Sequence, residues 1–345
     1  MSNGDTSLVV VDNSILSATA RCETYAYVRY ACGLNTRGES LAISAGSAIH
    51  VGAAAWLNGL QPGKALGLMA ATYEDSVERF LKVAELDDIP ADDSRFAPEW
   101  VEAIFAQYLE GNAEGWPFKV LARTAEKPIA AHFGELADGR AVRYVARLDA
   151  IVRKWSEGDA WSLDWKTTRK ASDWWIEKQK VSSQFSGQLW LGQQEEVAGT
   201  LRFLQAAGRD ATSPVSLAGV VLNVIEIPEK RKSDRKCPEH KVSYQECSIR
   251  HAGTHIVYIT RHAEELRAWE QSAHRLVIRY ARLLDKARKE GIEGVKGVSM
   301  QGRFNEGCVF CSQKEWCRLG RNVRPAAVKA TFVDDRWNPE RVQEG

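Results

Sequence analysis

The segment from Val145 to Lys170 constrains this chain most, because it predicts two adjacent strands that carry two carboxylates and a lysine. In the second strand Asp164 and Lys166 are two residues apart, so they project from the same face. Asp149 lies upstream at the end of an alternating apolar run, and a hairpin through 156–159 would bring it beside them. Oxygen ligands suit a hard divalent cation, and a neighbouring lysine can position or deprotonate an attacking water. The pattern indicates hydrolysis of a phosphodiester.

The same residues also fit a purely structural ion pair. Asp164 and Lys166 would then neutralise each other on a half-buried strand, and structural ion pairs often resemble functional sites. An unpaired charge in a short apolar strand is costly, so either a partner or a metal has to compensate Asp164. These residues alone do not separate the two interpretations.

The run ARLDAIVRKW followed by LDWKTT resembles the PD-(D/E)XK nuclease superfamily in its RecB-like branch, where a G-R-x-D strand precedes a D-x-K-T strand. Ala146 replaces the usual glycine. His50 in the segment GSAIH resembles the upstream histidine of that branch. Gln184 in SSQFSGQLW fits the glutamine of its Q-x-x-x-Y helix, and Gln188 stands where the tyrosine is usual. The resemblance implies an α/β fold with a restriction-endonuclease-like core, a mixed central sheet flanked by helices.

The resemblance also implies roles for individual residues. One or two Mg²⁺ or Mn²⁺ ions would be bound by Asp149, Asp164, the backbone carbonyl of Trp165, and His50. Lys166 would orient or activate the water, and Gln184 would fix the nucleophile or the DNA strand. Cleavage should be largely independent of sequence, because cations contact phosphates rather than base edges. We therefore expect a DNA exonuclease that acts on single strands or ends in recombination, end processing or phage replication, with recombination or replication proteins as partners.

Four of the seven cysteines form a widely split set. Cys308, Cys311 and Cys317 follow a C-x2-C-x5-C spacing, and Cys22 lies almost three hundred residues earlier. Four thiolates are what a [4Fe-4S] cluster needs, although zinc also takes four thiolates and is the general expectation for a C-x2-C pair. The split resembles the iron-sulfur subgroup of these nucleases, which includes CRISPR-associated and AddB-type exonucleases and phage-encoded relatives. With the nuclease motifs present, we expect the cluster.

A second group of metal-ligand residue types lies in CPEH and ECSIRH. Its members are Cys237, His240, Cys247, His251 and His255. Cysteine and histidine in a compact loop are plausible zinc ligands, but the spacing matches no zinc module, and the nuclease resemblance does not extend to it. An accessory zinc knuckle and an insertion loop with unligated thiols both remain open.

Charge and hydropathy limit the remaining classes of protein. A net charge of +1 argues against a protein that coats nucleic acid by bulk charge, although binding needs only a local basic track. The candidates beside the proposed site are Arg169, Lys170, Lys178 and Lys180. A second basic block spans 229–236, where a solvated surface is the alternative. The Met1 to Ser17 segment has no signal-peptide pattern and no run is apolar enough for a membrane span, so we expect a cytoplasmic location without membrane contact.

At 345 residues, the chain is expected to form one nuclease domain with helical additions. The expected parts are a mobile N-terminus (1–17), a single domain (18–322) and a loosely attached tail (323–345). Within the domain, 18–115 should be mainly helical, 116–260 the catalytic core, and 261–322 a long helix and the cysteines. Expected helices are Cys22–Gly33, Leu41–Leu60, Gly67–Leu86, Pro98–Gly111, Asp173–Ala198 and His262–Glu290. Expected strands are Phe118–Phe133, Arg140–Trp155, Trp161–Thr167, and the runs AGVVLNVIEI and THIVYIT.

Two other functions remain open. The chain could be a nuclease-fold subunit without activity that binds DNA or builds a complex, but intact Asp149, Asp164 and Lys166 count against it. It could also be an iron-sulfur electron carrier or redox sensor, in which case the nuclease motifs would be accidental. A visible spectrum separates a cluster from zinc, and metal-dependent DNA cleavage separates an enzyme from a silent subunit.

Overall fold

The structure is a computed structural model that describes residues 8–36, 40–113, 115–122, 128–154, 159–194, 217–229, 233, 235–299, 308, 311–320 and 322–340. The α-helices are α1 (Asn13–Arg21), α2 (Glu23–Ala26), α3 (Leu41–Leu57), α4 (Pro62–Ala84), α5 (Pro98–Ala113), α6 (Asp173–Lys180), α7 (Ser183–Gly192), α9 (Tyr244–Arg250), α10 (Ala263–Glu290), α11 (Lys314–Arg318) and α12 (Val328–Thr331). Other helical turns are a π-helix (Tyr27–Ala31) and two 3-10 helices (Ala91–Phe96 and Gly291–Gly297). The strands are β1 (Leu8–Val11), β2 (Leu34–Thr36), β3 (Phe118–Ala122), β4 (Pro128–Glu135), β5 (Ala141–Arg147), β6 (Ala150–Lys154), β7 (Ala160–Thr168), β8 (Leu217–Glu226), β9 (Thr254–Ile259) and β10 (Phe332–Asp334).

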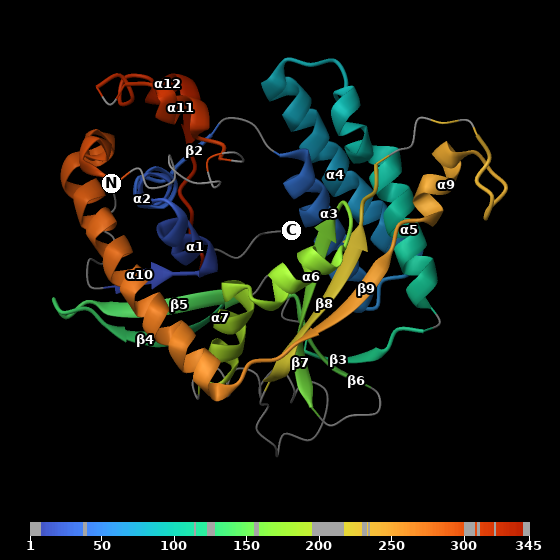
Figure 1. Cartoon of the computed structure of the whole chain (residues 1–345), viewed down its shortest axis with the longest axis horizontal. Coiled ribbons are helices and arrows are strands. Elements are labelled where there is room, and N and C mark those ends of the chain that lie inside the picture. The colour runs from blue at the N-terminus through green and yellow to red at the C-terminus, as the bar shows by residue number, and fades with distance from the viewer. Residues whose placement is uncertain are drawn as a thin grey trace.

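A five-stranded sheet forms the centre of the molecule, with the strand order β3-β6-β7-β8-β9. β7 and β8 pair in parallel, and the other neighbours pair antiparallel, so the sheet is mixed. Helices α3, α4 and α5 lie on one side of this sheet, and α7 and α10 lie on the other (Figure 1). This arrangement confirms the predicted mixed α/β fold with a restriction-endonuclease-like core.

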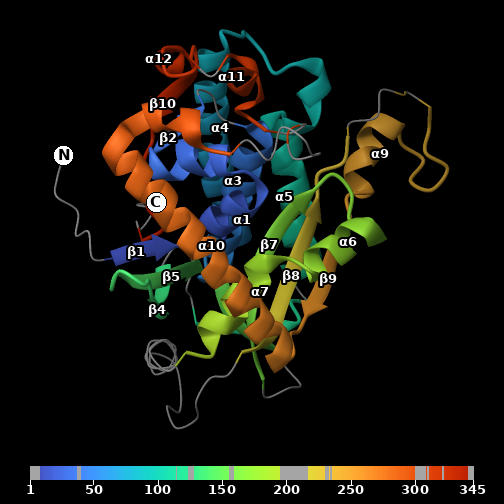
Figure 2. The ribbon, with the colours of Figure 1, turned by 60° about the vertical axis from the view of Figure 1, so that its left-hand side comes forward.

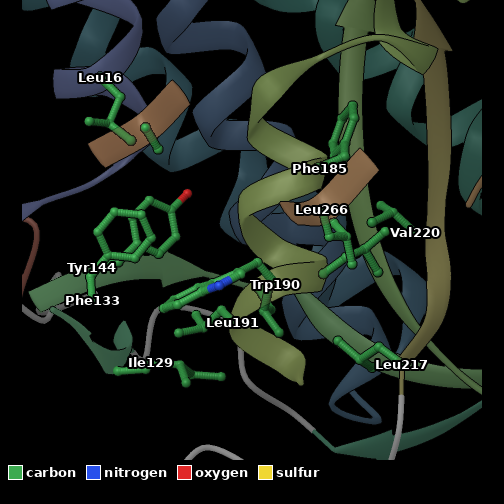
Figure 3. Packing of buried hydrophobic residues seen from close by; sticks show 14 of the residues in the cluster. Leu16, Ile129, Phe133, Tyr144, Phe185, Trp190, Leu191, Leu217, Val220 and Leu266 are labelled. Atoms are coloured by element: carbon green, nitrogen blue, oxygen red, sulfur yellow. The ribbon is translucent and has the colours of Figure 1, made fainter. Parts of the chain in front are cut away.

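The alternation of apolar residues on β8 accounts for this layering. Val221 and Ile225 pack in the hydrophobic cluster with α3, α4 and α5, whereas Val220, Leu222 and Val224 belong to the cluster with α7 and α10. Successive residues of a strand point to opposite faces, so a strand that is apolar throughout must be covered on both. Figure 3 shows part of the second cluster, in which Val220 lies near side chains of α7 and α10.

A smaller three-stranded sheet has the order β1-β5-β4, with β1 parallel to β5. Tyr144 and Phe133 of this sheet pack against Trp190 of α7 (Figure 3). Gly187 is required at this contact, because a Cβ there would come 2.0 Å from the Tyr144 hydroxyl. α7 thus lies between the two sheets and is held closely against both.

Segments near both ends of the described chain form contacts that the sequence did not predict. β1 pairs with β5, and Asp12 caps α1 by accepting a hydrogen bond from the N–H of Ile15. Near the other end, β10 pairs with β2, and Arg324 is buried. The indole N–H of Trp337 also donates to Asp12 Oδ2 at 2.9 Å. Local sequence patterns did not reveal these pairings because the partners lie far apart in the chain.

Three expected elements are each divided in two. The predicted strand 118–133 is β3 and β4, and the predicted strand 140–155 is β5 and β6, because the chain crosses between the two sheets in each case. The predicted helix 173–198 ends at Lys180, and α7 begins at Ser183 after Ser182 caps it. The antiparallel pairing of β6 with β7 confirms the predicted hairpin, although its turn at 155–158 lies outside the described residues.

The long helix predicted from the apolar repeat between 262 and 290 is confirmed as α10. No helix among the described residues is both long enough and apolar enough to cross a membrane.

Candidate active site

Asp164 and Lys166 lie side by side on β7, as their spacing predicted. The Lys166 ammonium nitrogen is 2.6 Å from Asp164 Oδ2, and the Asp164 side chain is only 4 % exposed. This contact pairs the buried Asp164 with Lys166, while a second carboxylate, Asp149, lies close enough to raise the Asp164 pKa. Two neighbouring carboxylates in a largely buried site are costly unless positive charge compensates both, as a bound metal ion would.

Two glutamines of α7 hold the other oxygen of the same carboxylate. Gln184 Nε2 donates to Asp164 Oδ1 at 2.9 Å, and Gln188 Nε2 donates to it at 3.3 Å. The two glutamines are four residues apart and therefore lie on one face of the helix. The sequence identified Gln184 but missed the role of Gln188, which stands where the resemblance places a tyrosine. The i, i+4 spacing was a signal that could have found it.

Asp149 directly precedes β6. It faces α3 and also β7, the strand that carries Asp164 and Lys166. Its Oδ2 accepts a hydrogen bond from the backbone N–H of Trp165 at 2.9 Å and lies 3.3 Å from His50 Nδ1. α3 approaches β7 closely, since a Cβ on Gly46 would lie 3.1 Å from Thr167 Oγ1. That approach brings His50 to the carboxylates from a helix one hundred residues upstream.

Trp165 is anchored on the opposite face of β7 from Asp164. Its indole N–H donates to the hydroxyl of Tyr108 at 3.1 Å, and Asn223 donates to the same hydroxyl at 2.9 Å. All three side chains are buried. Sequence reasoning missed Tyr108 and Asn223, because they lie on α5 and β8 and no local pattern connects them with the motif. Their contacts fix the strand that carries the charged residues.

The charges of the site oppose the effect of burial to different degrees. Burial raises the pKa of Asp164, Lys166 only partly offsets this, and the nearby Asp149 charge adds to the rise. Burial also acts to raise the pKa of Asp149, but the charges of His50 and Lys166 outweigh it and hold that pKa below its usual range. For His50 burial lowers the pKa, and Asp149 reverses the effect, so the pKa lies above its usual value. Asp164 is therefore the carboxylate that gains most from an added positive charge.

The donor set matches a hard divalent cation. Asp149, Asp164 and His50 could bind Mg²⁺ or Mn²⁺ together with the backbone carbonyl of Trp165, because carboxylate, carbonyl and imidazole groups are suitable ligands. A metal ion bound by Asp149 and His50 would replace their mutual contact of 3.3 Å.

The four proposed DNA-binding cations surround α6 but differ in their contacts. Arg169 forms an ion pair with Glu229 at 2.9 Å, and Lys180 forms one with Glu177 at 2.7 Å. Lys170 is exposed, and Lys178 Nζ lies 5.3 Å from the ring centroid of Trp174, whose side chain is 71 % exposed. The block 229–236 lies partly outside the described residues.

The structure brings Cys22, Cys308, Cys311 and Cys317 (the four-thiol group) into one neighbourhood. Burial raises the pKa of the Cys317 thiol to about 11, Arg324 opposes the rise, and the three other thiols add to it. Burial likewise raises the pKa of Cys311, to which Cys22 and Cys308 contribute. Cys22 directly precedes α2 and Cys317 lies on α11, and α2 lies below α11 and α12 in Figure 1.

A family model of the PD-(D/E)XK nuclease superfamily matches residues 13–318. The match begins at α1, ends at α11, and contains the carboxylates of β6 and β7, the glutamines of α7 and the four-thiol group. A comparison with curated proteins found no match to the chain.

Proposed function

The chain belongs to the PD-(D/E)XK nuclease superfamily, and from that premise we propose that it is a metal-dependent DNA exonuclease. The observation that carries the proposal is the environment of Asp164. Its buried carboxylate contacts Lys166 and two amides, and Asp149 lies beside it, so two carboxylates share the site with Lys166 and His50. A structural ion pair does not require a second carboxylate or amides that orient Asp164, whereas two oriented carboxylates are the ligands that a hard divalent cation takes.

The proposed roles follow from the contacts. A bound Mg²⁺ or Mn²⁺ would lower the pKa of a water and neutralise charge on the scissile phosphate. Lys166 is placed to orient that water, because its ammonium lies at the exposed edge of the carboxylate pair. Gln184 and Gln188 fix the orientation of Asp164. Asp149, Asp164, His50 and the backbone carbonyl of Trp165 are thus the proposed ligands, and Lys166 and the two glutamines are the groups that position ligands and water.

The proposed substrate is single-stranded DNA or a DNA end. Exposed Trp174 offers a ring face for base stacking, and Lys178 beside it can contact phosphate. Lys170 adds a second exposed cation near the end of β7. Aromatic and basic groups of this kind bind single strands with little sequence preference. We propose recombination, end processing or phage replication in the cytoplasm as the setting, with proteins of those processes as partners.

We also propose that the four-thiol group holds a [4Fe-4S] cluster with a structural role. The support is the convergence of four thiols from the two ends of the chain at a half-buried place. Thiolates alone suit both iron-sulfur clusters and zinc. Because burial raises the thiol pKa values, metal insertion would release protons there.

The test is cleavage of end-labelled linear DNA and of a covalently closed circle of the same sequence, each with and without Mn²⁺. We expect degradation of the linear DNA only, and only with metal. Asp164→Asn and Lys166→Ala should each lower the rate by at least about 100-fold, the scale of a lost positioned catalytic group. Asp75→Asn, an exposed carboxylate on α4, should keep the wild-type rate.

Cleavage of the circle, which has no ends, would contradict exonuclease activity but would still agree with a nuclease. A wild-type rate in well-folded Asp164→Asn would contradict the site. Metal-independent DNA binding without any cleavage would instead indicate a silent nuclease-fold subunit.

A further inference from the structure

The connection between β8 and β9 holds a compact group of four metal-ligand side chains at one edge of the molecule (Figure 2). They are Cys237, His240, Cys247 and His251, the Cys/His cluster, and their ligand atoms all lie within 4.8 Å of one another. Cys237 Sγ is 3.8 Å from His240 Nδ1 and 3.7 Å from His251 Nε2, and His240 Nδ1 is 3.0 Å from Cys247 Sγ. The sequence left a zinc knuckle open because the spacing fitted no known module.

A tight turn supplies the first two ligands. Lys236 and Ser243 form an isolated antiparallel bridge, and the N–H of Lys241 donates to the carbonyl of Cys237 at 2.9 Å. Lys241 has a φ of +59°, a left-handed conformation that an ordinary side chain adopts only where the surroundings require it. The turn therefore places Cys237 and His240 together.

A helix supplies the other two ligands. Cys247 lies on α9, and the N–H of His251 donates to the Cys247 carbonyl at 3.2 Å, so His251 continues the helical turn. Residues four apart on a helix share a face. The turn and the helix thus each contribute one cysteine and one histidine.

The distances suit one tetrahedral ion. Zn–S bonds of about 2.3 Å and Zn–N bonds of about 2.0–2.1 Å place neighbouring ligand atoms about 3.3–3.8 Å apart. The three measured separations, 3.0–3.8 Å, need only small side-chain movements to reach that geometry. Two thiolates and two imidazoles favour zinc over Mg²⁺ or Mn²⁺, which prefer oxygen ligands. Four protein ligands also leave no open position for a catalytic water.

The state of the thiols agrees with a metal site better than with a disulfide. Cys237 and Cys247 are 2 % and 0 % exposed, and no disulfide forms among the seven cysteines, all of which are described. The backbone N–H of His240 donates to the Cys237 sulfur, and a donor at this sulfur suits a thiolate, which is the form that binds metal.

Most of the turn that carries Cys237 and His240 lies outside the apolar core. Around the Cys/His cluster, Ile249 and Ala252 pack against the core near α5, whereas the turn itself is largely exposed and polar. A segment too small to build its own apolar core commonly depends on a metal or disulfide. We propose that Cys237, His240, Cys247 and His251 bind one structural Zn²⁺ that fixes the β8–β9 connection.

The test is the metal content of the full-length protein after expression with added zinc and dialysis against a weak chelator. Each variant is compared with wild type, and because all of them keep the four-thiol group, the difference counts only zinc at the Cys/His cluster. His251→Ala should lose one zinc ion per chain. His251→Cys should retain the ion, since three cysteines and one histidine form an established zinc ligand set. His255→Ala is the matched control, because His255 contacts Glu226 at 3.2 Å and lies outside the cluster.

Cobalt provides a second measurement that does not depend on zinc counting. Protein loaded with Co²⁺ should show the visible absorption of a tetrahedral thiolate site, and Cys247→Ser should lower it while Cys32→Ser leaves it unchanged. Retention of zinc by both His251→Ala and Cys247→Ser would overturn the proposal, as would wild-type protein that binds neither ion at this site. None of these outcomes depends on whether the protein cleaves DNA.

Discussion

The two groups of cysteines are built in opposite ways. The Cys/His cluster lies within fifteen residues of one loop, with one thiol whose pKa is lowered to about 6. The four-thiol group joins Cys22 to residues near 310, and burial raises the pKa of Cys317 to about 11. The Cys/His cluster is brought together by local structure, whereas the four-thiol group forms only when Cys22 meets residues from far along the chain.

The difference in loop length alone predicts only a small difference in stabilisation between the two cysteine groups. Loop-closure entropy grows by about 0.6 kcal/mol for each doubling of length, so the longer loop contributes only about 2.5 kcal/mol more. What each loop encloses matters more. The short loop encloses only the β8–β9 connection, and the long one encloses the whole five-stranded sheet, β4, β5 and the active site. Damage to the Cys/His cluster should therefore stay local, and damage to the four-thiol group should affect the whole protein.

The largest expected effect is that of Cys317→Ser. Protein purified without oxygen should be brown, and the variant should lose the colour, the cooperativity of unfolding and DNA cleavage together, because the bound group joins both ends of the fold. The measurements are the visible spectrum, iron content and thermal unfolding. Cys32→Ser is the control, since Cys32 packs in the same apolar cluster as Cys317, but its thiol hydrogen-bonds with Tyr27 and is not one of the four thiols. A colourless wild type with zinc, or a brown Cys22→Ser variant with full iron content, would contradict the assignment.

An intermediate effect is expected for Trp337→Ala. Trp337 donates to Asp12 and packs edge-on against Tyr30, so its loss removes apolar contact and leaves a buried carboxylate oxygen without its donor. We expect a loss of about 2 kcal/mol in the free energy of unfolding, below the full cost of a buried tryptophan because the side chain is partly exposed. Denaturant titration measures it. Trp337→Phe should recover the packing part only. No change in either variant would contradict a contribution of Trp337 to the stability of the fold.

The smallest expected effect concerns DNA binding near the Cys/His cluster. Lys170→Ala should lower the slope of log affinity against log salt by about one, because one phosphate contact is lost. Arg169→Ala should lower it by less, since Arg169 is already paired with Glu229. If damage to the Cys/His cluster stays local, Cys247→Ser should change the slope no more than Arg169→Ala. A larger change would show that the loop itself contacts DNA.

The sequence predicted the carboxylate–lysine pair because both residues lie on one strand, where a period of two fixes their faces. It predicted α10 from a long apolar repeat. It missed the divisions between β5 and β6 and between α6 and α7, because neither break carries glycine or proline. Ser172 and Ser182, the caps of the two short helices, were the available signals.

Contacts between segments far apart in the chain also could not be predicted from the sequence. Tyr108 and Asn223 support Trp165 from elements far away in the chain, and hydrophobic patterning assigns such residues to the core without assigning partners. The Cys/His cluster shows the same limit over a short range. Two of its ligands, Cys237 and His240, are brought together by a turn with one left-handed residue, Lys241, which no composition rule predicts.

The contact between Trp337 and Asp12 has a consequence for biosynthesis. Asp12 caps α1, and Trp337 is translated more than three hundred residues after it. Domains generally begin to fold as they emerge from the ribosome, but the cap of α1 gains its tryptophan donor only once residue 337 has emerged. Until then one oxygen of the capping carboxylate lacks this donor, so α1 reaches its full stability long after its own residues have been synthesised.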